Sequence, residues 1–188
     1  MSEKPERIRV TFDSGDVELV GYLYHAAAGN TDGDAPCVVM GHGFSGTQDR
    51  LFVGAERFAG AGFEVLTFDY RNFGESGGQL RQLVSIRGQL EDWRAAIRFA
   101  RTLEDVDPER IALWGSSLGG GHVVCVAAED PRIAAVVAQI PFNGFPRRVE
   151  GRSTPSSSCG LWVQTRCAVS LAARLSTYPW WVHRARWR

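Results

Sequence analysis

Segments typical of strands and segments typical of helices alternate along most of the chain, and this alternation is the feature that most restricts its fold. Short apolar runs typical of buried strands lie at 37–40, 63–68, 111–115 and 133–140. Apolar residues at helical spacing lie between them, at 51–59, 86–100 and 118–128. Strands that alternate with helices predict a mostly parallel sheet with helices on both faces. We therefore expect an α/β fold.

Two further strand-like segments precede this pattern. Ile8 to Phe12 and Val17 to His25 flank the polar turn 13–16, which predicts an antiparallel hairpin at the N-terminus. A length of 188 residues fits a single domain. We assign residues 1–146 to the N-terminal portion of one α/β domain and 147–188 to an irregular tail.

The tail differs sharply from the body in composition. All 21 acidic residues lie at or before Glu150, whereas the tail is basic and rich in Trp, Arg and Ser. Its arginines are spread out and it has no lysine, so we expect no nucleic-acid partner. Out-of-frame reading of a GC-rich gene favours such residues, and Trp180-Trp181 requires the codons TGGTGG. We therefore hypothesise that a frameshift near residue 152 produced the tail.

Several protein classes are not expected from the composition. No apolar run approaches the roughly 18 residues needed to span a bilayer, and the charged segment Met1 to Arg9 lacks the apolar stretch of a secretory signal. The four cysteines are scattered without Cys-x-x-Cys pairing, which is not typical of a metal site or a disulfide framework. We expect a cytoplasmic protein with no metal and no cofactor, and the sequence does not indicate its oligomeric state.

The strongest local motif is Gly-Ser-Ser-Leu-Gly at 115–119. It follows the strand that we predict at 111–115 and precedes the helix predicted from Leu118, the context of a nucleophile elbow. Gly115 and Gly119 would permit a sharp turn that exposes Ser117. The Leu118 N–H and the positive end of the helix dipole would then face a developing oxyanion. We predict Ser117 as a catalytic nucleophile.

A second motif, Gly-His-Gly-Phe at 41–44, directly follows a predicted strand. In an acyl-transfer enzyme it would present the Phe44 N–H as the second oxyanion donor. The spacing of Gly41, Gly43 and Gly46, with Asp69 ending the next strand, also matches the fingerprint of a dinucleotide-binding Rossmann domain. That alternative gives Ser117 no role and does not account for the preceding hairpin.

A third motif, Asp-Tyr-Arg-Asn-Phe-Gly-Glu-Ser-Gly-Gly at 69–78, is rich in turn residues. By itself it predicts a loop in which Asp69 and Arg71 pair or form hydrogen bonds. Taken in order, the three motifs resemble the α/β-hydrolase superfamily, most closely its serine-aminopeptidase-like, dienelactone-hydrolase-like and X-Pro-dipeptidyl-peptidase-like members. The resemblance covers about residues 7–146 and implies a serine hydrolase acting on a small-molecule acyl substrate.

The resemblance also implies a carboxylate and a histidine base after Ser117 in the chain. His122 lies five residues further on, along the helix that leads away from the elbow, so we do not expect it to reach the serine. His183 has the right order, and Asp130 or Glu150 could nominally serve as the acid.

The strand and helix pattern does not resume after Phe142, whereas family members continue with two more strands that carry the acid and the histidine. We therefore expect that the C-terminal part of the fold is missing. The sequence predicts a serine hydrolase that cleaves an ester, thioester or amide through an acyl-enzyme, with impaired activity in this chain. The alternative is a catalytically inactive fragment or a binding protein.

Overall fold

A computed structural model of the chain describes residues 7–27, 34–142 and 144. Contacts divide the chain into two units, 1–143 and 144–188, and the fold below is that of the first unit. The predictions made for the tail at 147–188, including those for Glu150 and His183, lie outside the described residues and stay predictions.

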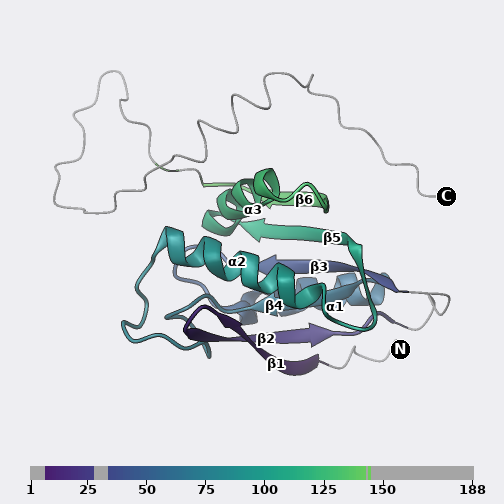
Figure 1. Cartoon of the computed structure of the whole chain (residues 1–188), viewed down its shortest axis with the longest axis horizontal. Coiled ribbons are helices and arrows are strands. Elements are labelled where there is room, and N and C mark those ends of the chain that lie inside the picture. Colours follow the sequence, from purple (N-terminus) through teal and green to yellow (C-terminus); the bar gives the residue numbers. More distant parts are fainter. Residues whose placement is uncertain (1–6, 28–33, 143, 145–188) are drawn as a thin grey trace, which may run out of the picture. The chain divides into compact units, whose positions relative to one another are not determined.

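Six strands form one mixed sheet in the order β1-β2-β4-β3-β5-β6 (Figure 1). The strands are β1 Arg7–Ser14, β2 Val17–Tyr24, β3 Ala35–Gly41, β4 Glu64–Phe68, β5 Val106–Ser116 and β6 Ile133–Gln139. The pairs β3–β4, β3–β5 and β5–β6 are parallel, whereas β1–β2 and β2–β4 are antiparallel. The mostly parallel sheet and the N-terminal hairpin are as the sequence predicted.

The hairpin turns within two residues. Ser14 pairs with Val17, so only Gly15 and Asp16 connect the strands. Gly15 has a φ of +67°, and glycine adopts such values without the steric cost of a Cβ atom.

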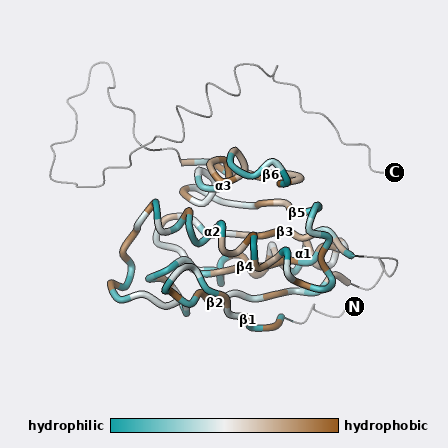
Figure 2. Tube along the Cα trace, viewed as in Figure 1, coloured by the Kyte–Doolittle hydropathy of each residue, from teal (hydrophilic) through white to brown (hydrophobic). Residues whose placement is uncertain are grey.

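Helices follow where the apolar spacing predicted them. The elements are a 3₁₀ helix Gln48–Leu51, α1 Phe52–Gly60, α2 Ile86–Ala100 and α3 Leu118–Glu129. Ser85 caps α2 by accepting a hydrogen bond from the Gly88 N–H at 3.2 Å. Apolar and polar residues alternate along α2 (Figure 2), and its apolar stripe, which includes Trp93 and Ile97, is buried.

The two faces of the sheet carry separate apolar cores. On one face, β3 and β4 contribute Val39 and Leu66, which belong to a cluster with residues of α2 and α3. On the other, Val38 and Val65 of the same strands belong to a cluster with α1. Because neighbouring residues of a strand point to opposite faces, this alternation confirms that helices cover both faces.

Two strands differ from the simple pattern. β5 begins at Val106, before the predicted strand at 111–115, so Asp107 and Pro108 lie within the strand where its register with β3 shifts. β6 pairs only with β5 among the strands of the described part of the chain, and its side chains are mostly exposed, including Val136 and Val137.

Candidate active site

Ser117 occupies a sharp turn between β5, which ends at Ser116, and α3, which begins at Leu118. Its backbone has φ 53° and ψ −116°, a conformation that costs a non-glycine residue about 1–3 kcal/mol. The turn is held by a hydrogen bond from the Ser117 N–H to the Gln139 carbonyl at 2.9 Å. The structure thus contains the strained strand–turn–helix that the motif predicted.

Close backbone approaches require the two glycines of the elbow. A Cβ atom on Gly115 would fall 2.3 Å from the carbonyl oxygen of Gly119. A Cβ atom on Gly119 would fall 2.5 Å from the carbonyl oxygen of His42. Real Cβ atoms do not approach backbone this closely, so a larger residue at either position would force the backbone of the elbow to shift.

Residues 41–46, which we call the glycine loop, lie against the elbow. A Cβ atom on Gly43 would fall 3.2 Å from the Cβ of Ser117 and 3.0 Å from the carbonyl oxygen of Ser116. The loop follows β3 and the elbow follows β5, and these strands are parallel neighbours. The carboxyl ends of adjacent parallel strands therefore bring the two motifs together.

Two backbone N–H groups beside this junction lack an acceptor. Neither the Phe44 N–H nor the Leu118 N–H donates a hydrogen bond to an atom of residues 7–27 or 34–142. Leu118 is the first residue of α3, and the first N–H groups of a helix have no partner within it. No acceptor among the described residues therefore occupies either group.

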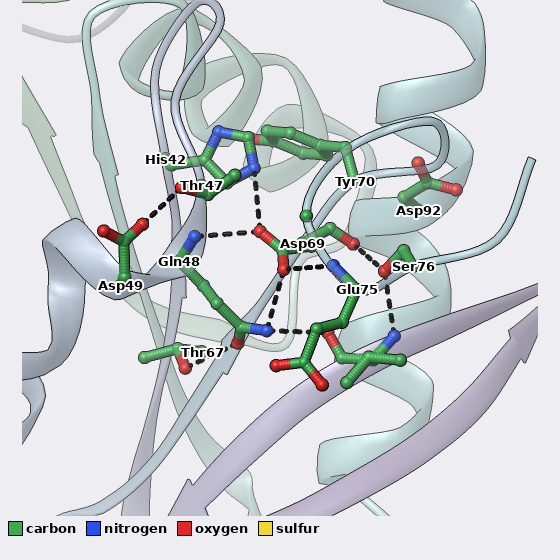
Figure 3. A network of polar contacts seen from close by, with 12 residues as sticks. His42, Thr47, Gln48, Asp49, Thr67, Asp69, Tyr70, Glu75, Ser76 and Asp92 are labelled. Carbon is green, nitrogen blue, oxygen red and sulfur yellow. Dashed lines mark hydrogen bonds and ion pairs between the residues drawn. The ribbon is translucent and has the colours of Figure 1, made fainter. Parts of the chain in front are cut away.

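A buried carboxylate, Asp69 at the end of β4, organises the residues behind the glycine loop (Figure 3). It accepts hydrogen bonds from the Gln48 N–H at 2.8 Å, the Gln48 side-chain amide at 3.0 Å and the Glu75 N–H at 3.1 Å. Its Oδ1 also lies 3.7 Å from Nε2 of His42. Thr67 in turn donates to the Gln48 side-chain oxygen at 3.0 Å.

This arrangement disfavours the dinucleotide-binding alternative. Asp69 is 2% exposed, and its two oxygens already accept from three N–H groups of the chain. A ribose-binding acid must present its carboxylate to the ligand. Asp69 instead joins the glycine loop to the loop at 69–78.

The prediction that Asp69 and Arg71 pair with each other is wrong, because each has a different partner. Arg71 bonds to Asp92 of α2, with Nε 2.9 Å and Nη2 2.8 Å from Oδ1, and the Arg71 N–H donates to Oδ2 at 2.9 Å. Asp92 is fully buried, so its charge requires such a partner. Both residues hold the loop at 69–78, as expected, but through separate contacts.

The described histidines do not act as a base for Ser117. His122 directs Nε2 to the side-chain oxygen of Gln89 at 2.9 Å, and burial, reinforced by His42, lowers its pKa to about 4. His42 directs Nδ1 to the Gly43 carbonyl at 3.0 Å. No hydrogen bond to the Ser117 hydroxyl is present within residues 7–27 and 34–142.

Asp130, one nominal acid, lies at the wrong end of α3. Ser117 precedes the first residue of this helix and Asp130 follows its last, a separation of about 18 Å for twelve residues. Asp130 pairs with Arg101 at 2.6 Å, which together with other hydrogen bonds lowers its pKa. The described residues therefore supply a candidate nucleophile and two N–H groups without an acceptor among them, but no acid or base bonded to that serine.

Sequence reasoning missed Gln48, Asp92 and Gln89. All three are polar, buried and bonded to the motifs described above. The only signal was the position of Gln89 and Asp92 on the inner side of α2, where the apolar stripe continues. Gln48 carried no such signal because its neighbours Thr47 and Asp49 are polar as well.

Two features are absent from the described part of the chain. No cluster of three or more His, Cys, Asp or Glu side chains there is able to hold a metal ion. No helix in this part of the chain is long and apolar enough to cross a membrane.

Comparison with known families gives a direct match over residues 34–188, to the model described as serine aminopeptidase, S33. The chain belongs to this family of hydrolases. The quorum-quenching protein AidA of Acinetobacter baumannii is 52% identical to it over 138 residues. That match covers 72% of this chain and 44% of AidA.

Two further proteins are similar to this chain. The thiohydrolase aneE of Aspergillus aculeatus is 38% identical over 127 residues, which are 67% of this chain and 38% of aneE. The crystal structure of hypothetical protein PA2218 from Pseudomonas aeruginosa superposes with a TM-score of 0.71 at 33% identity, covering 76% of this chain and 44% of PA2218. The chain thus spans less than half the length of these relatives, and its fold is that of an α/β-hydrolase.

Proposed function

We propose that this chain is a serine hydrolase that forms an acyl-enzyme at Ser117. The observation that carries the proposal is the strained backbone of Ser117, with φ 53°, next to two N–H groups that have no acceptor in the described structure. Strain of this kind persists where the surrounding structure enforces it, often at active sites. The Phe44 and Leu118 N–H groups would form the oxyanion hole.

The reaction would proceed in two stages. Oγ of Ser117 attacks the acyl carbonyl carbon, and its proton passes through a base to the leaving group as the bond to that group breaks. Water then attacks the acyl-serine, releases a carboxylic acid and returns the proton to Ser117. In both stages the carbonyl oxygen becomes an oxyanion, which the two N–H groups would stabilise.

The base and the acid would come from outside residues 7–142. His183 and Glu150 are candidates within this chain, and the relatives extend well beyond the region that matches. If neither residue reaches Ser117, the oxyanion hole and substrate binding alone retain about 10³–10⁴-fold catalysis over water. We therefore propose slow turnover by this chain.

The substrate would carry an ester, thioester or amide bond. A relative named as a thiohydrolase supports including thioesters. The described residues contain no metal cluster, and the proposed chemistry needs neither a metal nor a cofactor.

Labelling and turnover test this proposal together. The chain is treated with a fluorophosphonate probe, which reacts with activated serines, and is assayed with p-nitrophenyl acetate. We expect labelling and turnover in the wild type and in Ser116→Ala, a control one residue away, and loss of both in Ser117→Ala. Labelling that persists in folded Ser117→Ala would refute the proposal.

A binding protein without catalysis is the second candidate. It is favoured by the lack of any described histidine bonded to the Ser117 hydroxyl. In that case a folded wild-type sample would show neither labelling nor turnover. A non-hydrolysable acyl phosphonate ester would still bind in calorimetry, with the same affinity in Ser117→Ala.

A further inference from the structure

The ring of His42 lies between two oxygens that accept hydrogen bonds. Its Nδ1 is 3.0 Å from the Gly43 carbonyl and its Nε2 is 3.7 Å from Oδ1 of Asp69. Nε2 is buried and has no hydrogen-bond partner among the described residues. A carbonyl only accepts, so the shorter contact requires the proton on Nδ1. Because burial lowers the pKa of His42, the ring is neutral and Nε2 carries no proton.

The bond from Nδ1 fixes the plane of one peptide group. The Gly43–Phe44 peptide is trans, so its carbonyl and its N–H point in opposite directions. The Gly43 carbonyl accepts from Nδ1 of His42 and, at 3.3 Å, from the Gly46 N–H. The Phe44 N–H is therefore directed away from the His42 ring.

Glycine at position 43 makes such a restraint necessary. A glycine has few backbone preferences, so its peptide groups rotate more easily than those of other residues. Gly43 also packs against Ser117. A rotation of this peptide would place a carbonyl oxygen, rather than an N–H, beside the elbow, where it would repel an oxyanion.

We propose that His42 is the positioning residue of the glycine loop, and that its Nδ1–H holds the Gly43–Phe44 peptide in the orientation that presents the Phe44 N–H to the substrate. This inference rests on the proposed acyl-enzyme function. His42 does not touch the substrate, and its effect passes through the backbone.

The surroundings hold the ring in place. Its plane meets Tyr70 edge to face at 4.5 Å between centroids, and Phe73 at 6.0 Å. Asp69 lies beside the opposite nitrogen, and its carboxylate accepts from the Gln48 N–H, just after the glycine loop. The aromatic contacts thus hold the ring, and the carboxylate holds the segment that follows the glycine loop (Figure 3).

Two substitutions distinguish the role of Nδ1 from that of Nε2 in His42. The amide nitrogen of His42→Asn can occupy the place of Nδ1 and donate to the Gly43 carbonyl. The amide of His42→Gln reaches instead toward the place of Nε2, near Asp69. Both variants are polar and uncharged, so they form a matched pair.

We expect His42→Asn to keep kcat for p-nitrophenyl acetate within about threefold of the wild type. His42→Gln should lower kcat by about 10²-fold, the lower part of the range for loss of an oxyanion donor, with KM nearly unchanged. Equal activity of the two variants, or a greater loss in His42→Asn, would overturn the inference. Circular dichroism verifies that both variants fold.

Nitrogen-15 NMR of the His42 imidazole in the wild type determines which ring nitrogen carries the proton, independently of catalysis. The inference requires Nδ1 protonated and Nε2 unprotonated at neutral pH. A proton on Nε2 with a bare Nδ1 would overturn it even if the ester is hydrolysed. An inactive wild type with Nδ1 protonated would refute the proposed function while supporting the role of His42 in setting the peptide.

Discussion

Gly43 packs directly against Ser117, with only 3.2 Å between the Ser117 Cβ and the position that a Cβ atom on Gly43 would occupy. These two residues come from different motifs and follow different strands, β3 and β5. Their contact is the point where the candidate nucleophile meets the loop that would stabilise the oxyanion. Because of this contact, any side chain at position 43 would disturb the geometry of Ser117.

Gly43→Ala tests this sensitivity. The added methyl group must displace the Ser116 carbonyl or Ser117 by a few tenths of an ångström, and small misplacements near a reacting atom are costly. We expect fluorophosphonate labelling to slow by about tenfold. Gly54→Ala in α1 is the control, since a Cβ there would meet only the flexible end of Met40, at an ordinary 3.4 Å. Equal labelling rates would show that the contact does not matter.

Gly119→Ala tests the packing of the elbow through stability. The new Cβ would lie 2.5 Å from the carbonyl oxygen of His42, and backbone must move to relieve the overlap. Overpacking of this kind costs about 1–3 kcal/mol, to be measured as the free energy of unfolding in urea. Gly60→Ala is the control, because a Cβ there meets nothing within 4 Å. An unchanged midpoint of urea unfolding in Gly119→Ala would contradict the close approach of Gly119 to the His42 carbonyl.

Arg71→Met tests the buried pair with Asp92. Removing the guanidinium leaves the fully buried Asp92 carboxylate without its partner, at a cost of about 3–5 kcal/mol. Arg87→Met removes an exposed helix-surface pair with Glu91, for which we expect less than about 0.5 kcal/mol. The two variants are compared by thermal and chemical denaturation. Similar losses would mean that Asp92 is not held as described.

The partners of the charged residues Asp69 and Arg71 could not be predicted from the sequence. Asp69 and Arg71 are close in the chain, which suggested a mutual contact, yet each bonds to a different element. Partners on other elements, such as Gln48 and Asp92, are set by the crossing of strands and helices. Patterns of apolar residues do not encode those distances.

The elements themselves were largely predictable because their signals are local. The stripe of α2 gave its bounds at Ile86 and Ala100, and the elbow motif gave the turn at Ser117. The start of β5 was missed because Pro108 is typical of a turn. The helix predicted at 118–128, which α3 confirms, already separates Asp130 from Ser117.

His122 makes stability depend on pH. Burial, with a smaller contribution from His42, lowers its pKa from 6.5 to about 4, so the unfolded chain binds a proton that the native chain does not. The free energy of unfolding should therefore fall as the pH drops from about 6.5 to about 4, with about 2 kcal/mol lost by pH 5 through this residue.

Urea denaturation of the wild type and of His122→Gln at pH 7.5 and pH 5 measures this contribution. The glutamine amide can replace Nε2 at Gln89 and does not titrate, so the variant should lose less stability on acidification. The same loss in both proteins would rule out His122 as its source.

The most direct test of the central claim is mass spectrometry of peptides from fluorophosphonate-treated protein. We expect one adduct, located on Ser117, in the wild type and in Ser116→Ala. An adduct on Ser116 or another serine, or no adduct in folded wild-type protein, would contradict it.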